Sequence, residues 1–444
     1  MDILRPVITS ARHEVAPGEL FFSTTDSRGR ILQANSVFTR MSRYRRDQLV
    51  GQPHNIIRHD CMPGGAFQLM WDTLHAGRPF CAYVDNLAAT GSTYSVFATI
   101  TPLGDGYLSV RNRPGVDQLR STAFSLYGQV RPYELALRDE GLSTHDAAQH
   151  GLGTLAGLLA DAGLTYEQFM WTALPAEVDV VLQNSISRTQ RPDARGPLKE
   201  ILNHVATTRA DLLTWTTQMV GLQAMSEQLS QTATLLMQAV AENRHTSEQI
   251  SSAPRAGFDA SVIYLRVWAD IAELLEPIFT RLAETLNQLN ARCSQTRFRI
   301  ALALLHVEAL TQFVNEALDE GDYSEGHRIS VLLLVRALDE GLQVASSESQ
   351  AMTEMVALVT ADISAVADLI SMPQSMITTW LRTASATKDG AELISTVTEQ
   401  RAHTDYAWQR LNDLITRARQ VSNPLNVNRA RSEIDAVRYW TSSS

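Results

Sequence analysis

The stretch that decides the fold runs from Leu20 to Ala34 and reads LFFSTTDSRGRILQA. Its first part, Leu20–Thr25, is rich in aromatic and β-branched residues and predicts a strand. The next four residues, Asp26-Ser27-Arg28-Gly29, have the composition of a tight turn. Arg30–Ala34 then predicts the returning strand of an antiparallel hairpin. The chain therefore opens with β-structure.

The residues after this hairpin predict the rest of an α+β domain. Asn35 to Asp60 contains short helical pieces, and Ala66–Ala76 carries apolar side chains at helical spacing. Three more strands are predicted at Phe80–Leu87, Thr93–Ile100 and Tyr107–Arg111. This order of elements is typical of an antiparallel sheet with short helices on it. We place this domain at residues 20–113, after an N-terminal cap of residues 1–19.

Beyond Pro114 the sequence becomes helical in character, and β-type runs disappear. Apolar residues at spacings of three and four predict a long amphipathic helix, which must bury one face against another helix. These residues are Ile271, Leu275, Ile278, Leu282, Leu286 and Leu289. A turn at Glu320-Gly321-Asp322 predicts a helical hairpin. Strict heptads are not sustained, so we expect an all-α bundle, with a connector at residues 114–253 and the hairpin or bundle at residues 254–444.

Prolines and glycines predict where these helices end or bend. We expect breaks near Ser252–Pro254, Pro373, Gly390 and Pro424. Pro277 lies inside the apolar stripe, and we expect it to kink the helix there.

Composition narrows the function. The chain has 444 residues and a net charge of −10, and it has no basic run, so nucleic acid is not an expected partner. Its three cysteines, Cys61, Cys81 and Cys293, are odd in number and far apart, which argues against a disulfide framework and favours the cytoplasm. No signal peptide and no apolar run of about 18 residues is found, so no membrane span is expected.

A series of short motifs runs through residues 20–113 in a fixed order. They include Ser23-Thr24-Thr25-Asp26, Asn35, Gly51-Gln52-Pro53-His54-Asn55, Arg58-His59, Met62-Pro63, Met70-Trp71, Gly77, Pro79, Tyr94 and Ser109-Val110-Arg111. In order and spacing they resemble the flavin-binding PAS domain of bacterial aerotaxis receptors. The resemblance covers roughly a fifth of the chain. It implies a PAS fold, with FAD held between the sheet and the short helices.

The resemblance also implies a set of cofactor-binding residues: Asn35, Arg58, His59, Trp71 and Phe80. A flavin needs an apolar slot for its ring, polar groups at the rim and cations for its pyrophosphate. Arg58 could chelate a phosphate and Asn35 could read a ring edge. Two positions differ from the family. Asp60-Cys61 replaces its Pro-Asp, and Phe80 replaces a tryptophan.

We therefore expect a cytoplasmic, non-enzymatic PAS sensor that reports redox or oxygen state through its helices, as in aerotaxis. A homodimer and a downstream signalling protein are the expected partners, and the helical region resembles a diverged soluble chemoreceptor. The alternative is a cofactor-free PAS scaffold for dimerisation and protein interaction. Haem on one of the histidines and a thiol sensor are minor alternatives; the residues concerned are His54, His59, His75, Cys61 and Cys81. No phosphate loop or metal-binding pattern indicates an enzyme in residues 150–440.

Overall fold

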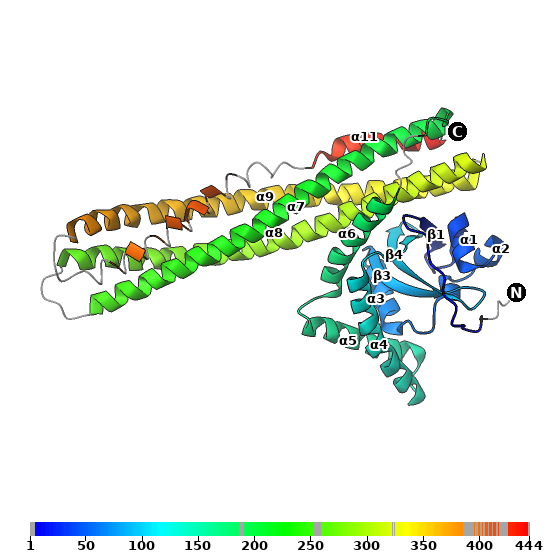
Figure 1. Cartoon of the computed structure of the whole chain (residues 1–444), viewed down its shortest axis with the longest axis horizontal. Coiled ribbons are helices and arrows are strands. Elements are labelled where there is room, and N and C mark those ends of the chain that lie inside the picture. Colours follow the sequence, from blue (N-terminus) through cyan, green and yellow to red (C-terminus); the bar gives the residue numbers. More distant parts are fainter. Residues whose placement is uncertain are drawn as a thin grey trace. The chain divides into compact units, whose positions relative to one another are not determined.

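The computed structural model describes residues 5–185, 191–252, 259–321, 323, 325–384 and 425–442, together with scattered positions between 395 and 416. The chain forms two compact units (Figure 1). The first unit comprises residues 1–216, 297–345 and 426–444, and the second comprises residues 217–296 and 346–425. The predicted domain boundaries remain a prediction, because each unit combines segments that are distant in the sequence.

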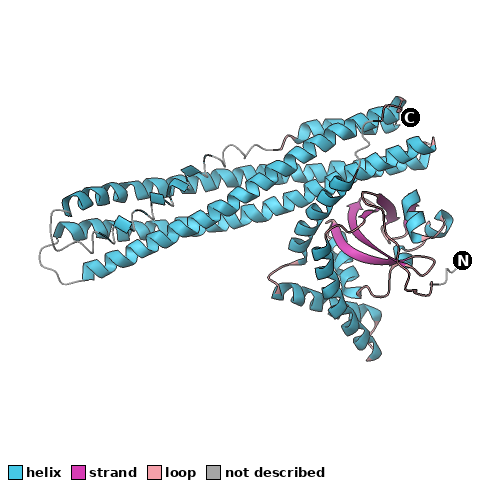
Figure 2. Ribbon diagram, in the orientation of Figure 1, coloured by secondary structure: helices cyan, strands magenta, loops and turns pink. Residues whose placement is uncertain are grey.

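A five-stranded antiparallel sheet lies in the first unit, with the strand order β2-β1-β5-β4-β3. Figure 2 shows its strands in magenta. The strands are β1 (Leu20–Asp26), β2 (Ile31–Ala34), β3 (Phe80–Leu87), β4 (Thr93–Leu103) and β5 (Gly106–Asn112). All five predicted strands are confirmed, with ends that move by three residues at most. The hairpin turn between β1 and β2 depends on Gly29, whose φ of 74° suits glycine.

Short helices between β2 and β3 cover one face of the sheet. They are α1 (Ser36–Ser42), α2 (Arg46–Leu49), the 3₁₀ helix η1 (His54–Ile57) and α3 (Gly64–His75). A hydrophobic core forms between α1 and the sheet, and its fully buried side chains include Phe21, Ile31, Phe38, Tyr94 and Val96. We call this the inner face of the sheet. The antiparallel sheet with short helices is therefore the α+β domain that the sequence predicts.

The opposite, outer face of the sheet packs against helices that follow it in the sequence. Helices α4 (Asp117–Asp139), α5 (Thr144–Asp161) and α6 (Tyr166–Asn184) come directly after β5. Tyr83 and Phe97 on the outer face contact each other with ring centroids 4.9 Å apart, and Tyr83 also contacts Phe169 of α6. The sheet is thus buried on both faces within the first unit.

After α6, the structure describes three long helices and a short one. They are α7 (Gly196–Ser252), α8 (Asp259–Glu320), α9 (Glu325–Ala384) and α11 (Val427–Ser442). Part of α8 covers the outer face in the first unit, where Phe313 packs edge-on against Phe22 at 5.0 Å. In the second unit the predicted stripe is buried, with Leu275, Leu282 and Leu286 fully covered.

The turn at residues 320–322 is confirmed where it is described. Helix α8 ends at Glu320, and Gly321 has a φ of 66°, which lets the chain reverse. The break expected at Pro373 is wrong, because α9 continues through it to Ala384. One missing hydrogen bond is a local cost that a long helix absorbs. Pro277 likewise lies inside α8, whereas Gly390 and Pro424 lie outside the described residues.

In the part of the chain that the structure describes, no helix combines the length and the apolar character that a membrane span requires.

Candidate functional site

A cavity of about 420 Å³ lies on the inner face of the sheet, between the strands and the helices η1 and α3. Alternate residues of β3, β4 and β5 point into it, as the two-residue period of a strand requires. The apolar lining comprises Ile57, Phe67, Met70, Trp71, Leu74, Val84, Ala98 and Ile100. The polar lining includes Thr25, His54, Asn86, Ser109 and Arg111. A mostly apolar slot with a few polar groups is typical of a site for a planar organic cofactor.

Arg111 is a buried cation at this cavity. Its side chain belongs to a residue that is only 5% exposed, and its Nη1 donates to Ser23 Oγ at 3.1 Å. Its Nη2 donates to His54 Nε2 at 2.7 Å. No carboxylate of the described residues pairs with it, and burial lowers the pKa of its guanidinium to about 10. A buried charge without a counter-ion is costly, so this position favours a ligand that brings negative charge.

His54 is neutral in this arrangement. Burial lowers its pKa well below 6.5, and the positive charge of Arg111 lowers it further. Because a guanidinium can only donate, His54 Nε2 must accept, which leaves the ring proton on Nδ1. The ring also stacks on Phe38, with centroids 5.8 Å apart. Arg111, His54 and Ser23 therefore connect the cavity to η1 and β1.

Asn86 supplies an unsatisfied donor to the same cavity. The residue is 4% exposed, and its Nδ2 has no hydrogen-bond partner among the described residues. A buried donor of this kind costs free energy unless an acceptor arrives, and here the cavity is the space from which one can arrive. Asn86 and Arg111 are on predicted strands, but neither was among the predicted site residues. The sequence feature that could have indicated them is a polar residue at one of the alternate positions of a strand that point toward the core.

Two of the predicted residues, Arg58 and Trp71, line the cavity. The Arg58 guanidinium lies over the Phe67 ring, 3.8 Å from its centroid, and Nη2 donates to the Met62 carbonyl at 3.1 Å. Burial, followed by the nearby Arg131, lowers the Arg58 pKa to about 10. The Trp71 indole lies close to Gly29 in the cavity lining: a Cβ added to Gly29 would lie 3.0 Å from the indole ring.

The other three predicted residues lie away from the cavity lining. Asn35 caps α1, where its Oδ1 accepts from Phe38 N at 3.1 Å and from Phe22 N at 3.3 Å. His59 Nδ1 accepts from the backbone N of Cys61 at 3.1 Å. Phe80 stacks face to face on Tyr166 of α6 at 5.2 Å. These contacts give each residue a structural role, so their predicted part in cofactor binding stays a prediction.

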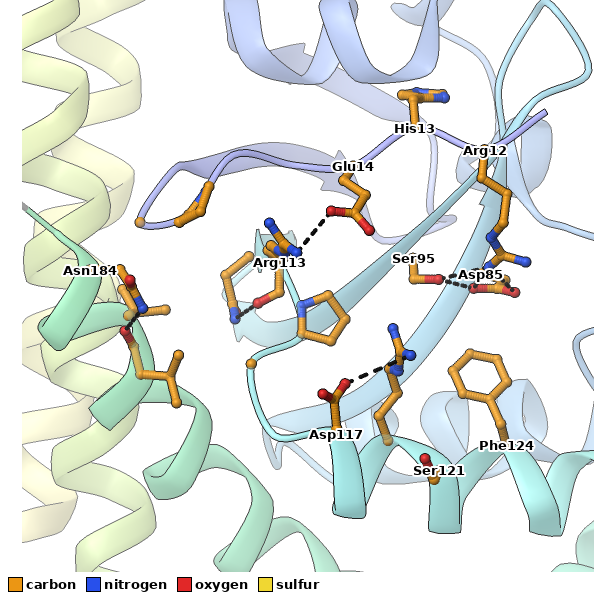
Figure 3. Close-up of a pocket in the computed structure, with 18 residues that line it drawn as sticks. Arg12, His13, Glu14, Asp85, Ser95, Arg113, Asp117, Ser121, Phe124 and Asn184 are labelled. Atoms are coloured by element: carbon orange, nitrogen blue, oxygen red, sulfur yellow. Dashed lines mark hydrogen bonds and ion pairs between the residues drawn. The ribbon is translucent and has the colours of Figure 1, made fainter.

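A larger cavity, of about 790 Å³, lies between the N-terminal segment, the sheet, α4 and α6 (Figure 3). Its charged residues lie in pairs. Arg113 contacts Glu14 at 2.8 Å, Arg12 contacts Asp85 at 3.2 Å, and Arg120 contacts Asp117 at 3.7 Å (Figure 3). A site in which each cation already faces a carboxylate does not suit an apolar ring.

Two buried glutamates join the sheet domain to α4, α5 and α6. Glu134 of α4 accepts from the backbone N–H groups of Gly64 and Gly65, both at 2.7 Å, at the start of α3. A Cβ on Gly151 of α5 would lie 2.1 Å from Glu134 Oε1, so only glycine fits this crossing. The helix that carries Trp71 is therefore fixed directly to α4 and α5.

Glu177 of α6 makes the second junction. Its carboxylate accepts from Tyr83 Oη at 2.8 Å and from Asn112 Nδ2 at 3.3 Å. It also accepts from the backbone N–H groups of Gly115 and Val116 at 2.7 and 3.0 Å. Burial raises its pKa, and these four donors oppose that rise. One carboxylate thus holds β3, β5 and the entry to α4 together.

The cysteines do not have the environment of a reactive thiol. Burial and the negative charge of Asp85 raise the Cys61 pKa to about 11. Burial raises the Cys81 pKa well above its usual value of 9.0. A thiol sensor needs a lowered pKa, because the thiolate is the reacting form.

Comparison with known proteins gives matches for part of the chain. No protein-family model matches it. Over 113 residues the chain is 38% identical to the aerotaxis receptor of Escherichia coli (strain K12), a match that covers 24% of the chain and 22% of the receptor. It is 33% identical over 89 residues to the nitrogen fixation regulatory protein of Klebsiella pneumoniae, covering 20% of the chain and 18% of that protein. The matches therefore span about a fifth of the length of these curated relatives.

Among solved structures, the chain is similar to the crystal structure of a Rhodobacter sphaeroides LOV protein at 17% identity. That match covers 32% of the chain and 89% of the LOV protein, with a TM-score of 0.21. Two observations describe the N-terminal domain: the match to the aerotaxis receptor, and the antiparallel sheet with its helices between β2 and β3. Residues 20–113 have the antiparallel sheet and short helices of a PAS-type fold, a long helical region follows them, and over 113 residues the chain is similar in sequence to part of the aerotaxis receptor.

Proposed function

We propose that the chain is a redox sensor whose PAS domain binds a flavin, FAD in the first place, and whose helices pass its state to a partner. The observation that carries the proposal is a pair of buried polar groups on the wall of an apolar cavity, the Asn86 amide and the Arg111 guanidinium. Neither finds a complete set of partners within the described protein. Both are groups that a flavin would satisfy.

The lining fits the chemistry of a flavin ring. A bound flavin supplies electron-transfer chemistry through a flat, largely apolar ring, and its reduction adds negative charge to one edge. The apolar walls, with Trp71 and Ile100 among them, suit the flat faces of such a ring. Arg111 would stabilise negative charge at the edge, and Asn86 Nδ2 would donate to an acceptor on the rim. The low dielectric of the cavity strengthens both interactions.

Two arginines favour a flavin that carries phosphates. Arg58 and the exposed Arg28 both line the cavity. The fork of a guanidinium matches phosphate oxygens in geometry and charge. Arg58 and Arg28 would therefore hold the pyrophosphate, while the ring enters the apolar part.

The histidines do not favour haem. An axial ligand needs an imidazole nitrogen that faces the ring plane and is free. His54 Nε2 is held by Arg111 at 2.7 Å, and His59 Nδ1 accepts from Cys61 N. His75 is exposed at the end of α3 and stacks on Trp71. A flavin uses the cavity without displacing any of these contacts.

Glu134 connects the cavity to α4, so a change at the cofactor could be transmitted to the helices through it. A change in charge at Arg111 would act on His54 and Ser23, and a shift of the ring would act on Trp71 and so on α3. Glu134 fixes the start of α3 to α4. A packed junction of this kind converts a small displacement into a choice between two arrangements.

The location, the oligomeric state and the output of the sensor are part of the same proposal. The sensor would act in the cytoplasm, as a homodimer, without catalysing a reaction of its own. Its output would be the binding of a signalling protein to the helical surface, in the manner of aerotaxis signalling. A cofactor-free scaffold is the rival function, and it predicts an empty cavity.

The first test is the absorption spectrum of the full chain purified from cells, with release of any cofactor by heat. We expect two flavin bands that bleach with dithionite, and FAD in near one-to-one ratio. Arg58→Ala should lose cofactor, whereas Arg138→Ala, an exposed arginine on α4, should keep it. A protein that stays colourless after incubation with excess FAD would contradict the flavin proposal and favour the cofactor-free scaffold. A Soret band would instead indicate haem bound by one of the histidines.

A further inference from the structure

A separate cleft, of about 560 Å³, lies in the first unit beside α1 and α2. Four arginines from one short segment line it: Arg40, Arg43, Arg45 and Arg46. The remaining lining comes from β1 and β2, from the end of α8 with Phe313, Glu316 and Glu320, and from the start of α9 with Gly326, His327 and Ser330. The cleft shares no lining residue with the flavin cavity.

The charge of this segment contrasts with that of the chain as a whole, whose net charge is −10. Arg40 pairs with Glu19, and Arg45 pairs with Asp47 at 2.8 Å. Arg43 and Arg46 are both exposed, and neither forms an ion pair with a carboxylate among the described residues. Two cations thus remain available to a ligand in the cleft.

The backbone at Arg43 gives an independent reason to assign this arginine a function. Arg43 caps the C-terminus of α1 with φ 59° and ψ 12°, the left-handed conformation. It is the only non-glycine residue with a positive φ in the described chain. Glycine or asparagine is usual at such a cap, because other side chains are strained there. A strained backbone with a charged side chain facing a cleft indicates that the side chain is needed.

We propose that this cleft binds a small phosphate ester that carries hydroxyl groups, such as a sugar phosphate. The guanidinium groups of Arg43 and Arg46 would hold the phosphate, since arginine matches its geometry. Glu316 and Glu320 can only accept hydrogen bonds while ionised, so they would accept from hydroxyl groups and repel a second phosphate. A bound ligand would join α1 and α2 to the α8–α9 turn, which makes it a second input to the sensor.

The test is titration calorimetry of the full chain with ribose 5-phosphate at low ionic strength, where surface charges act most strongly. We expect saturable binding, and weaker binding of inorganic pyrophosphate. Arg46→Ala should weaken binding by about tenfold, in keeping with the loss of a charge-assisted contact. Arg138→Ala is the matched control and should bind as the unchanged chain does.

Arg43→Gly separates the side chain from the fold. Glycine relieves the backbone strain, so the melting temperature of this variant should not fall, while its affinity for ribose 5-phosphate should fall by about tenfold. Unchanged affinity in both variants would overturn the proposal. So would binding that only Arg58→Ala abolishes, because that result places the phosphate at the flavin cavity. Binding of the chain to phosphatidylglycerol vesicles without binding of ribose 5-phosphate would assign the arginines to a lipid surface and would equally overturn it.

Discussion

Two sets of buried polar groups, one on each face of the sheet, are in opposite states. On the outer face, Tyr83 and Asn112 donate to Glu177, whose carboxylate is saturated by four donors. On the inner face, Asn86 Nδ2 has no partner among the described residues and Arg111 has no counter-ion. Asn112 and Arg111 are neighbours on one strand, so the difference follows from the face and not from the region. A buried polar group whose hydrogen bonds are all made within the protein stabilises the fold, whereas one that lacks a partner can form a hydrogen bond or ion pair with a ligand.

The largest effect should come from breaking the saturated face. Glu177→Ala removes one acceptor from four buried or half-buried donors, so we expect the free energy of unfolding to fall by about 3–5 kcal/mol. Hydrogen exchange of the β3 and β5 amides should accelerate, which localises the loss. Glu167→Ala on the same helix removes only an exposed pair with Arg78, and its cost should stay below about 1 kcal/mol. Equal effects of the two variants would contradict the comparison.

The inner face should respond in the opposite sense. Arg111→Met removes a buried cation without a counter-ion, so the flavin-free protein should be as stable as before, within about 1 kcal/mol. Flavin affinity should fall by about a hundredfold, because a charged contact in a low-dielectric site is lost. Fluorescence titration with FAD and denaturation of the flavin-free protein measure the two quantities. Arg113→Met, at an exposed position two residues on, is the control. A large loss of stability in Arg111→Met would show that the arginine is structural.

Each face also carries a buried histidine, and the one on the outer side gives a pH test. His306 of α8 lies 3.4 Å from Thr101 Oγ1, and burial lowers its pKa to about 4. The unfolded chain binds this proton near pH 6.5 and the folded chain does not. The contribution of His306 to stability should therefore be constant above pH 7 and fall as the pH drops from 6.5 toward 4, by at most about 1.4 kcal/mol per pH unit, and His54, whose pKa burial also lowers, should add to this loss.

The matching variant is His306→Leu, measured by denaturation across this pH range without flavin. Its stability should depend less steeply on pH than that of the unchanged chain. His145→Leu, at an exposed position on α5, should leave the slope as it was. If the slope persists in His306→Leu, the acid sensitivity belongs to other groups.

The smallest effect is expected at Asn86. Asn86→Ala deletes one donor that has no partner in the described protein, so flavin-free stability should change by less than about 1 kcal/mol. Flavin affinity should fall by about tenfold, the loss of one hydrogen bond. Thr93→Ala, a buried position at the start of β4 outside the cavity lining, is the control for a change in the sheet alone. Flavin binding unchanged by Asn86→Ala would exclude the Asn86 amide from flavin recognition and leave Arg111 as the proposed contact at the ring edge.

Sequence reasoning located the strands well because their signals are local. Residues 80–87 were predicted to the residue as β3, and β1 ends at Asp26, one residue later than predicted. The break predicted at Pro373 was wrong, because α9 continues through this position to Ala384 and a single proline need not end a long helix.

The site was predicted in part. The motifs indicated Arg58 and Trp71, but they did not indicate Asn86 and Arg111 as site residues. The sequence of a strand shows which residues share a face, but it does not show whether that face lines a cavity. Asn35 has a structural role that its motif did not predict. Its side chain was expected to read a flavin edge, whereas here it accepts two backbone hydrogen bonds at a helix start, as asparagine often does. Only long-range contacts distinguish these roles.

The contact of Glu134 with Gly64 and Gly65 has one more consequence, for the way a dinucleotide can be held. In many nucleotide-binding proteins the free N–H groups at the start of a helix receive the phosphates. Here those of α3 are already taken by a carboxylate of the same chain, which also neutralises that end of the helix dipole. In the proposed FAD complex, phosphate recognition would then depend on the side chains of Arg58 and Arg28. Contacts of that kind weaken with ionic strength, so FAD should leave the protein more readily in concentrated salt than a deeply cradled cofactor would.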